Sequence, residues 1–196
     1  MLSELLEGVD TLAVRGATDR EVRGLSLDSR HVSPGEAFFA LPGVHADGAR
    51  FAAAAVEAGA IAVFGGAGLE ALPGTVVEVA EPRLALAQAA VRFNGHPSRE
   101  LGVVAVTGTN GKTTTTWLVE AMFTAWGRRA GLIGTTGVRV AGELSPSPFT
   151  TPEAPELQGL LAGMRTAGVT HVALEASSHA LVQRREIGRA SCRERV

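Results

Sequence analysis

The sequence predicts an α/β protein, in which a small α/β domain precedes the first part of a phosphate-loop domain with a parallel sheet. Two observations lead to this fold class. Short β-rich runs alternate with Ala/Leu-rich helical runs along the chain. A glycine-rich loop that contains the only lysine, Lys112, directly follows an apolar strand-like run. Strand, crossover helix and strand imply a parallel sheet with ligands at the carboxyl ends of its strands.

The first half of the chain reads as a complete small domain. We expect strands at 37–41, 60–64 and 75–79, with helices at 49–58 and 83–93. Pro82 fits the first turn of the second helix, where its missing N–H costs nothing. The run 94–98, Asn-Gly-His-Pro-Ser, breaks the pattern. It predicts a domain boundary, with a first domain at 1–97 and a second at 98–185.

The second half opens with an expected strand at 102–106, followed by the glycine-rich loop and a helix from about 113 to 126. Further strands are expected at 131–133 and 171–175, with a helix at 152–167 between them. The glycine clusters at 65–68 and 131–137 do not lie between a strand and a helix with an acidic residue at the right distance. They therefore indicate turns rather than dinucleotide sites.

Composition excludes some classes of function. The 196 residues are 45% hydrophobic with a mean hydropathy of +0.17, enough for a buried core. Net charge is −2 and aromatic residues make up 5%, so we expect no nucleic-acid partner. The N-terminus is acidic without an apolar signal segment, and no apolar run reaches membrane-spanning length. We therefore expect a cytoplasmic protein without membrane insertion.

The final segment, 186–196, holds the only cysteine, Cys192, and has no hydrophobic period. It resembles the translation of a sequencing-adapter read-through, and a natural polar tail is the alternative. Without this segment the chain has no disulfide, thiol nucleophile or cysteine-based zinc site. We expect the tail to be non-native and the natural protein to continue beyond Arg185.

The glycine-rich loop has the chemistry of a phosphate-binding site. The chain contains 17 arginines, yet Lys112 is the residue in this loop. Glycines let backbone N–H groups turn toward phosphate oxygens, and a compact ammonium fits where a planar guanidinium is too broad. The next hydroxyl, on Thr113, can bind magnesium. The expected phosphate-binding residues are Gly108, Thr109, Asn110, Gly111, Lys112, Thr113 and Thr114. The alternative is a surface lysine in an ordinary glycine loop.

The loop departs from the usual phosphate-loop spacing, because its first glycine is Gly108 and Val106 stands where a glycine is expected. Gly-Thr-Asn-Gly-Lys-Thr-Thr resembles the phosphate loop of the Mur ligase superfamily, which includes the ATP-dependent amino-acid ligases of peptidoglycan synthesis and the related folylpolyglutamate and cyanophycin synthetases. The resemblance implies ATP and Mg²⁺ as cofactors.

Segments 27–40 and 43–48 resemble the N-terminal uridine-diphosphate-binding domain of the MurE-type ligases, the UDP-N-acetylmuramoyl-tripeptide synthetases. By resemblance, Ser29 and His45 contact the UDP-sugar. A serine hydroxyl can hydrogen-bond a pyrophosphate, and the loop 43–47 can offer backbone groups to a uracil edge. The alternative is structural: Asp28 and Ser29 cap a turn and Arg30 pairs with a carboxylate.

Segment 149–153 resembles the family's paired-threonine loop, which places Thr150 and Thr151 on the sugar-peptide substrate. Phe149 stands where the family often has asparagine. A helix N-cap by Thr151, with Pro152 at the first helical position, is the alternative.

Segment 174–185 resembles the MurE-type run Glu-x-Ser-Ser-His-Gly-Leu-x-Gln-x-Arg, with Ala180 in place of the usual glycine. Glu175 closes a strand beside the phosphate loop, where it can complete a magnesium site with Thr113. A salt bridge is the alternative for this carboxylate. The resemblance also directs three side chains toward the muramoyl-dipeptide: Ser177, Gln183 and Arg185. His179 is expected to act indirectly or as a cap.

The family reading implies a ligase in which Lys112 and Glu175 are catalytic. ATP phosphorylates the γ-carboxylate of D-glutamate in UDP-N-acetylmuramoyl-L-alanyl-D-glutamate, and the amine of a diamino acid attacks the acyl phosphate. The resemblance implies a monomeric enzyme. A carbamylated lysine and the domain that selects the diamino acid come later in family members, so we expect the given chain to be inactive. A MurF-type ligase, another phosphate-loop ligase or kinase, and a stand-alone UDP-sugar-binding module are the alternatives.

Overall fold

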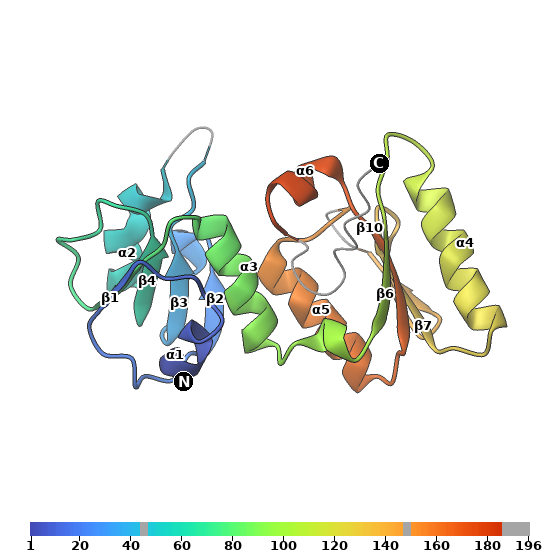
Figure 1. Cartoon of the computed structure of the whole chain (residues 1–196), viewed down its shortest axis with the longest axis horizontal. Helices are drawn as coiled ribbons and strands as arrows, with labels where there is room; N and C mark the ends of the chain where they lie inside the picture. The colour runs from blue at the N-terminus through green and yellow to red at the C-terminus, as the bar shows by residue number, and fades with distance from the viewer. Residues whose placement is uncertain (44–46, 147–149, 186–196) are drawn as a thin grey trace. The chain divides into compact units, whose positions relative to one another are not determined.

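The computed structural model describes residues 1–43, 47–146 and 150–185. The chain forms two compact units, Met1–Phe93 and Asn94–Val196 (Figure 1). The division falls between Phe93 and Asn94, whereas the sequence places the boundary after Pro97. Each unit contains a five-stranded sheet of its own.

The first unit has the strand order β1-β5-β4-β3-β2. The strands β2, β3, β4 and β5 run parallel to one another. The edge strand β1 pairs with β5 in the antiparallel direction. The strand bounds are β1 Ala13–Arg15, β2 Gly24–Ser26, β3 Glu36–Phe39, β4 Ala62–Gly65 and β5 Thr75–Glu78. The helices are α1 Leu2–Leu6, η1 Ser29–His31, η2 Gly48–Phe51, α2 Ala52–Glu57 and α3 Pro82–Phe93.

Both faces of the first sheet are buried. Phe39 and Phe64 stack with their ring centroids 4.4 Å apart and pack with residues of α1 and α3. Phe38 and Val63 point to the opposite face, where they pack with α2. Buried strands with apolar side chains on both faces are typical of parallel sheets. Because Pro82 is the first residue of α3, its predicted place in the first helical turn is confirmed.

The second unit has the strand order β6-β10-β7-β8-β9. The strands β6, β10 and β7 run parallel, while β8 and β9 extend the sheet as an antiparallel meander. The strand bounds are β6 Gly102–Val106, β7 Ala130–Gly134, β8 Gly137–Val140, β9 Glu143–Ser145 and β10 His171–Glu175. The helices are η3 Pro97–Arg99, α4 Lys112–Ala125, α5 Ala154–Thr166 and α6 Ser178–Val182.

The structure confirms the α/β class with parallel sheets and departs from the expected elements in three places. Segment 131–137 contains more strand than the expected 131–133, because β7 and β8 leave only Thr135 and Thr136 between them as a turn. The capping alternative for Thr151 is wrong, since α5 begins at Ala154 and Glu153 occupies the N-cap position. Several short elements were not predicted, because a segment of three to five residues shows little periodicity. They are α1, β1, β2, β8, β9, α6, η1 and η3.

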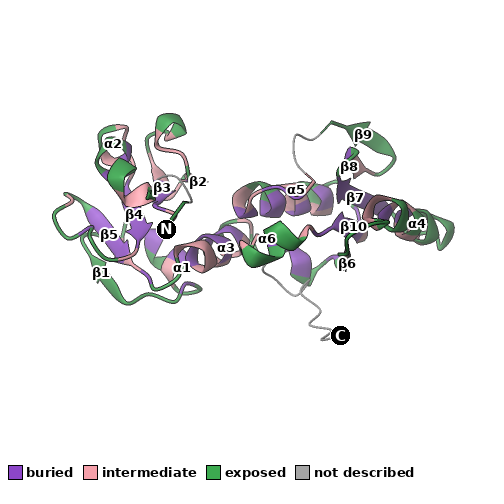
Figure 2. Cartoon of the chain, turned by 90° about the horizontal axis from the view of Figure 1, so that it is seen from above, coloured by how far each residue is buried: buried purple, intermediate pink, exposed green. Residues whose placement is uncertain are grey.

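In the second unit, α4 and β6 are largely exposed (Figure 2), and both carry exposed apolar side chains. On α4 these are Leu118, Met122 and Trp126, at 60, 69 and 64% exposure, and they follow one another at four-residue spacing. Val104 on the edge strand β6 is 41% exposed. Among the residues that the structure describes, no helix is both long and apolar enough to cross a membrane.

Candidate functional site

The phosphate-loop candidate lies between the carboxyl end of β6 and the start of α4. Gly111 is the N-cap of α4 and adopts a left-handed conformation, with φ of 79°, which a residue with a Cβ rarely adopts. The helix begins at Lys112, so the first-turn amides of Lys112 and Thr113 have no acceptor within the helix. These amides and the positive end of the helix dipole form an anion-binding position.

Lys112 folds over its own loop. Its Nζ donates to the carbonyl oxygen of Gly108 at 2.7 Å and to that of Thr109 at 3.3 Å. The side chain is partly buried, and the ammonium therefore lies at the loop, where a phosphate group would enter.

A cavity of about 490 Å³ lies in front of this loop. It brings the loop together with residues from three other segments, namely the β7–β8 turn, the loop before α5 and the carboxyl end of β10. The lining residues are Thr109, Asn110, Gly111, Lys112, Thr113, Thr114, Thr135, Thr150, Glu175 and Ser177. Parallel strands β6, β10 and β7 are neighbours, so their carboxyl ends meet at this edge.

Glu175 is the buried acidic group of the cavity, with no exposed surface. Its Oε2 accepts hydrogen bonds from Thr113 Oγ1 at 3.1 Å and Thr135 Oγ1 at 3.0 Å. Its Oε1 accepts from the Thr135 amide at 3.1 Å. Within the described part of the chain no basic side chain forms an ion pair with Glu175. The donors that hold the carboxylate in the described structure are thus neutral.

The pair Thr113 and Glu175 fits a magnesium ion. Mg²⁺ binds oxygens octahedrally at about 2.1 Å, which places adjacent ligand oxygens about 3.0 Å apart. Thr113 Oγ1 and Glu175 Oε2 are 3.1 Å apart and line the same cavity. No group of three His, Cys, Asp or Glu side chains gathers as a metal site in the described ranges. One carboxylate, one hydroxyl, phosphate oxygens and water match the usual sphere of Mg²⁺.

The two threonines of the 149–153 segment lie differently. Thr150 lines the cavity, and its Oγ1 is 3.1 Å from Thr135 Oγ1. Thr151 is buried, donates to the Glu175 carbonyl at 2.9 Å and accepts from the Ser177 amide at 3.2 Å. Its hydroxyl therefore ties the end of β10 to the segment before α5, whereas the Thr150 side chain faces the cavity.

The segment after Glu175 forms the short helix α6. Ser177 is its N-cap and accepts from the Ala180 amide at 3.1 Å, while also lining the cavity. Arg185 directs its guanidinium to Gln183 and Glu153, with the Glu153 carboxylate 2.8 Å away, and donates to the Thr151 carbonyl at 2.9 Å. The Arg185 guanidinium, which the sequence predicts to bind a substrate carboxylate, therefore contacts other residues of the chain in this structure.

The first unit has a cavity of about 410 Å³ at its own candidate site, lined by Leu27, Asp28, Ser29, Arg30, Phe38, Leu41, Gly48 and Phe51. The sequence-based alternative for Asp28 is also present. Asp28 caps η1 through the Arg30 amide, and its carboxylate lies 2.6 Å from the Arg30 guanidinium. Hydrogen bonds from Arg30 hold the pKa of Asp28 well below its usual range. His45 lies outside the described residues.

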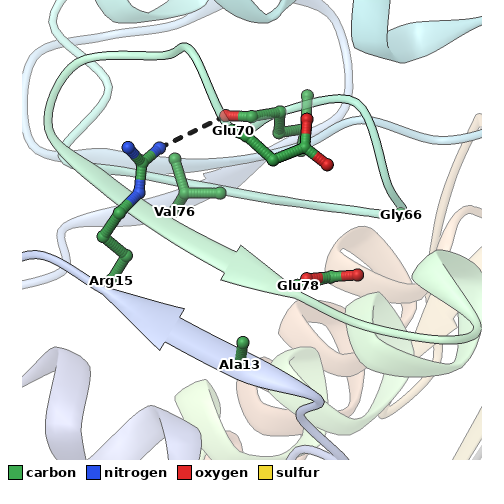
Figure 3. A pocket seen from close by; sticks show the side chains of 7 residues that line it. Ala13, Arg15, Gly66, Glu70, Val76 and Glu78 are labelled. Atoms are coloured by element: carbon green, nitrogen blue, oxygen red, sulfur yellow. Dashed lines mark hydrogen bonds between the residues drawn. The ribbon is translucent and has the colours of Figure 1, made fainter.

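A smaller cavity of about 220 Å³ contains no residue that the sequence analysis selected (Figure 3). Its wall includes Ala13 of β1 and Val76 of β5, with Arg15 and Glu70 at the rim. The Arg15 guanidinium donates to the carbonyls of Leu69 and Leu72. This cavity is lined by apolar residues together with Arg15, Glu70 and Glu78, and the arginine is already hydrogen-bonded within the chain.

Sequence reasoning did not select Thr135, although it makes two of the three hydrogen bonds to the Glu175 carboxylate. Its position two residues after the expected strand 131–133, between Gly134 and Gly137, was the available signal. A polar residue at the carboxyl end of a parallel strand lies at the ligand-binding edge of the sheet.

A loop that turns from a parallel strand into a helix N-terminus, with a lysine over it and a buried carboxylate on the adjacent strand, is typical of phosphate-loop nucleotide-binding proteins. The Mur ligase middle domain matches residues 106–193, and the Mur ligase family catalytic domain matches residues 21–97. The chain belongs to the Mur ligase family.

Similar proteins carry more specific names. The chain is 46% identical over 185 residues to a UDP-N-acetylmuramoyl-L-alanyl-D-glutamate–2,6-diaminopimelate ligase of Geobacter sulfurreducens, covering 94% of this chain and 36% of that protein. It is 48% identical over 170 residues to a UDP-N-acetylmuramyl-tripeptide synthetase of Deinococcus radiodurans, covering 84% and 34%. A solved structure of a 2,6-diaminopimelate ligase of this type is 31% identical with a TM-score of 0.76, covering 94% and 38%. The chain spans about a third of the length of these relatives.

Proposed function

We propose that this chain is the UDP-sugar-binding and phosphate-loop part of a MurE-type ligase, which adds a diamino acid to UDP-N-acetylmuramoyl-L-alanyl-D-glutamate at the expense of ATP. The observation that carries the proposal is the shared cavity, where the phosphate loop, Glu175, Thr150 and Ser177 meet. The likeness to tripeptide synthetases and diaminopimelate ligases over most of the chain supports this choice of reaction.

In this proposal the second unit positions the phosphates of ATP. The first-turn amides of α4 and the Lys112 ammonium bind phosphate oxygens, which requires Lys112 to leave the Gly108 and Thr109 carbonyls. Thr113 and Glu175 would hold Mg²⁺, which when bound would supply charge neutralisation at the phosphates. Catalysis of this kind rests on positioning and on charge stabilisation rather than on a protein nucleophile.

The remaining candidate residues bind the acceptor substrate. Thr150 and Ser177 face the cavity and would lie near the carboxylate that receives the phosphoryl group, with Thr151 holding their two segments together. Gln183 and Arg185 reach the muramoyl-dipeptide once the Arg185 fork exchanges its internal partners. Ser29 and His45 contact the UDP moiety in the first unit. By resemblance to the family, the full-length enzyme acts in the cytoplasm as a monomer.

Nucleotide binding tests the first part of the proposal. Calorimetric titration of the 196-residue chain with Mg·ADP should show binding, and Lys112→Ala should weaken it at least about tenfold through the loss of a phosphate contact. Lys112→Arg should be nearly as damaging, because the guanidinium is too broad for the loop. Wild-type affinity in Lys112→Arg would refute the phosphate role of this lysine.

Binding of the UDP-linked substrate tests the second part. We expect the chain to bind UDP and UDP-N-acetylmuramoyl-dipeptide, and Ser29→Ala to weaken both, while Lys112→Ala leaves UDP binding unchanged. Indifference of the folded chain to both compounds would remove the uridine assignment and leave a phosphate-loop protein of another specificity.

Two alternatives predict other results. A small kinase would bind Mg·ADP and be indifferent to UDP compounds, yet β6, which carries the phosphate loop, is an edge strand of the described sheet. A stand-alone UDP-sugar-binding module would bind UDP and show no response to Lys112 substitutions. A MurF-type ligase shares the fold and would differ in the peptide that it accepts.

A further inference from the structure

Thr135 joins the candidate metal site to the candidate substrate loop. It lies in the turn between β7 and β8, and its hydroxyl is 3.0 Å from Glu175 Oε2 and 3.1 Å from Thr150 Oγ1. Its amide donates to the other carboxylate oxygen, Oε1, at 3.1 Å. One residue therefore contacts both oxygens of Glu175 and also the hydroxyl that faces the substrate.

The direction of these hydrogen bonds follows from the proton count. A carboxylate only accepts, so the single hydroxyl proton of Thr135 is donated to Glu175. The Thr150 hydroxyl then donates its proton to Thr135. Toward any other partner, the Thr150 oxygen can only accept a hydrogen bond. The Thr113 hydroxyl donates to the same Oε2 from the phosphate-loop side. The protein thus fixes the orientation of three hydroxyls around one buried carboxylate.

We propose that Thr135 is a positioning residue that orients Glu175 for Mg²⁺ and links this carboxylate to the substrate-facing Thr150. The proposal rests on the proposed function, because it assumes that Glu175 and Thr113 hold the metal. The Thr135 amide holds Oε1 on the β7 side, and the Thr135 hydroxyl donates to Oε2, the oxygen that also accepts from Thr113. Hydrogen-bond partners of metal-binding carboxylates fix ligand orientation, and their loss typically costs about 10–100-fold in metal affinity.

Thr135→Val removes the hydroxyl and keeps the branched shape and the amide, so it isolates the hydroxyl contacts. We expect it to lower the affinity for Mn²⁺, measured by electron paramagnetic resonance in the presence of ADP, about tenfold. Affinity for ADP without metal should stay within about twofold. Thr135→Ser restores a hydroxyl and should recover most of the Mn²⁺ affinity.

Thr136→Val is the matched control. The neighbouring Thr136 accepts a hydrogen bond from Trp117 Nε1 at 3.1 Å, and in the described structure its hydroxyl makes no hydrogen bond to Glu175. It should leave the Mn²⁺ affinity unchanged. Wild-type Mn²⁺ affinity in Thr135→Val, or equal losses in both valine variants, would overturn the positioning role.

The outcome separates this inference from the proposed function. If the wild-type chain binds neither ADP nor Mn·ADP, both the nucleotide site and the role of Thr135 are refuted. If the wild-type chain binds Mn·ADP and Thr135→Val binds it equally well, only the role of Thr135 falls. A loss of metal-free ADP affinity equal to the loss of Mn²⁺ affinity would mean that the substitution disturbs the loop as a whole, and would also refute the proposal.

Discussion

Glycine at position 134 leaves room for the Glu175 carboxylate. A Cβ built on Gly134 would lie 2.7 Å from Glu175 Cδ, closer than real Cβ contacts allow. Glu175 is fully buried and held by Thr113 and Thr135, so a displacement of its carboxylate would break these hydrogen bonds. The close approach of β7 backbone to a side chain of β10 is therefore a requirement of the site.

Gly134→Ala should displace the carboxylate and destabilise the second unit by about 1–3 kcal/mol, the usual cost of overpacking. Urea unfolding followed by tryptophan fluorescence measures this, because both tryptophans, Trp117 and Trp126, lie in the second unit. Gly163→Ala is the control, since Gly163 lies within α5 and a Cβ there meets nothing within 4 Å. That change should stabilise by about 0.5–1 kcal/mol. Equal stabilities of Gly134→Ala and the wild type would show that Glu175 can relocate.

Asp28 stabilises the entry to the candidate uridine cavity by capping η1 and pairing with Arg30. Asp28→Ala should lose the cap, at a cost of about 1 kcal/mol, whereas Asp28→Asn keeps an acceptor for the Arg30 amide. Hydrogen exchange at the Arg30 amide should accelerate in the alanine variant and change little in the asparagine variant. Equal exchange rates in all three proteins would mean that the cap contributes nothing.

The pKa of Asp28 predicts how this turn responds to pH. Because the folded-state pKa is lowered, the stabilisation is complete above the unfolded value of about 3.9 and is lost as pH falls through the lower folded value. Protection of the Arg30 amide should therefore fall with acidification below about pH 4 in the wild type. Asp28→Asn should show no such loss, since an amide does not titrate.

At the scale of elements, the C-terminal part of α4 packs on the start of β10 through aromatic contacts. The His171 ring lies 4.8 Å from Phe123 and 5.7 Å from Trp126, measured between centroids. Burial, together with the charge of Arg128, lowers the pKa of His171 below its ordinary value. The folded protein thus favours the neutral imidazole at this contact.

The unfolded chain binds a proton at His171 below about pH 6.5, whereas the folded chain resists it. Stability should therefore fall as pH decreases from 6.5 toward the lower folded pKa, and should not change further from this cause once both states are protonated. His171→Phe keeps a ring and removes the titration, so its unfolding free energy should depend less on pH between 7 and 5. Identical pH slopes in the two proteins, measured by tryptophan fluorescence, would contradict the assignment.

At the scale of the whole molecule, the apolar stripe of α4 and the edge strand β6 leave apolar side chains in contact with water. Exposed strand edges and contiguous apolar patches favour association. We expect the purified chain to self-associate as its concentration rises, as measured by sedimentation velocity.

Replacing Leu118, Met122 and Trp126 together by glutamine should reduce this association. The matched control is Leu12→Gln in the first unit, because Leu12 is similarly exposed, at 66%, and lies outside the stripe. A wild-type chain that sediments as a monomer at all concentrations, or association that survives the triple substitution, would refute the role of the stripe.

The sequence by itself determined the α/β class, most of the long helices and parallel strands, and the place of the phosphate loop. These features depend on residues close in sequence: periodicity sets a helix or a strand, and glycines beside Lys112 set the loop. The strands that contain Phe38 and Val63 could be predicted from the sequence, because apolar residues occupy both of their faces.

Only the tertiary structure decided which side chains meet. The order β6-β10-β7 inserts the last strand between two earlier ones, which brings Glu175 between Thr113 and Thr135. The same packing buries Thr151 and leaves Thr150 at the cavity, although the two are adjacent in sequence. Local patterns carry no information on strand order or on the burial of individual side chains, because both arise from contacts between residues that are far apart along the chain.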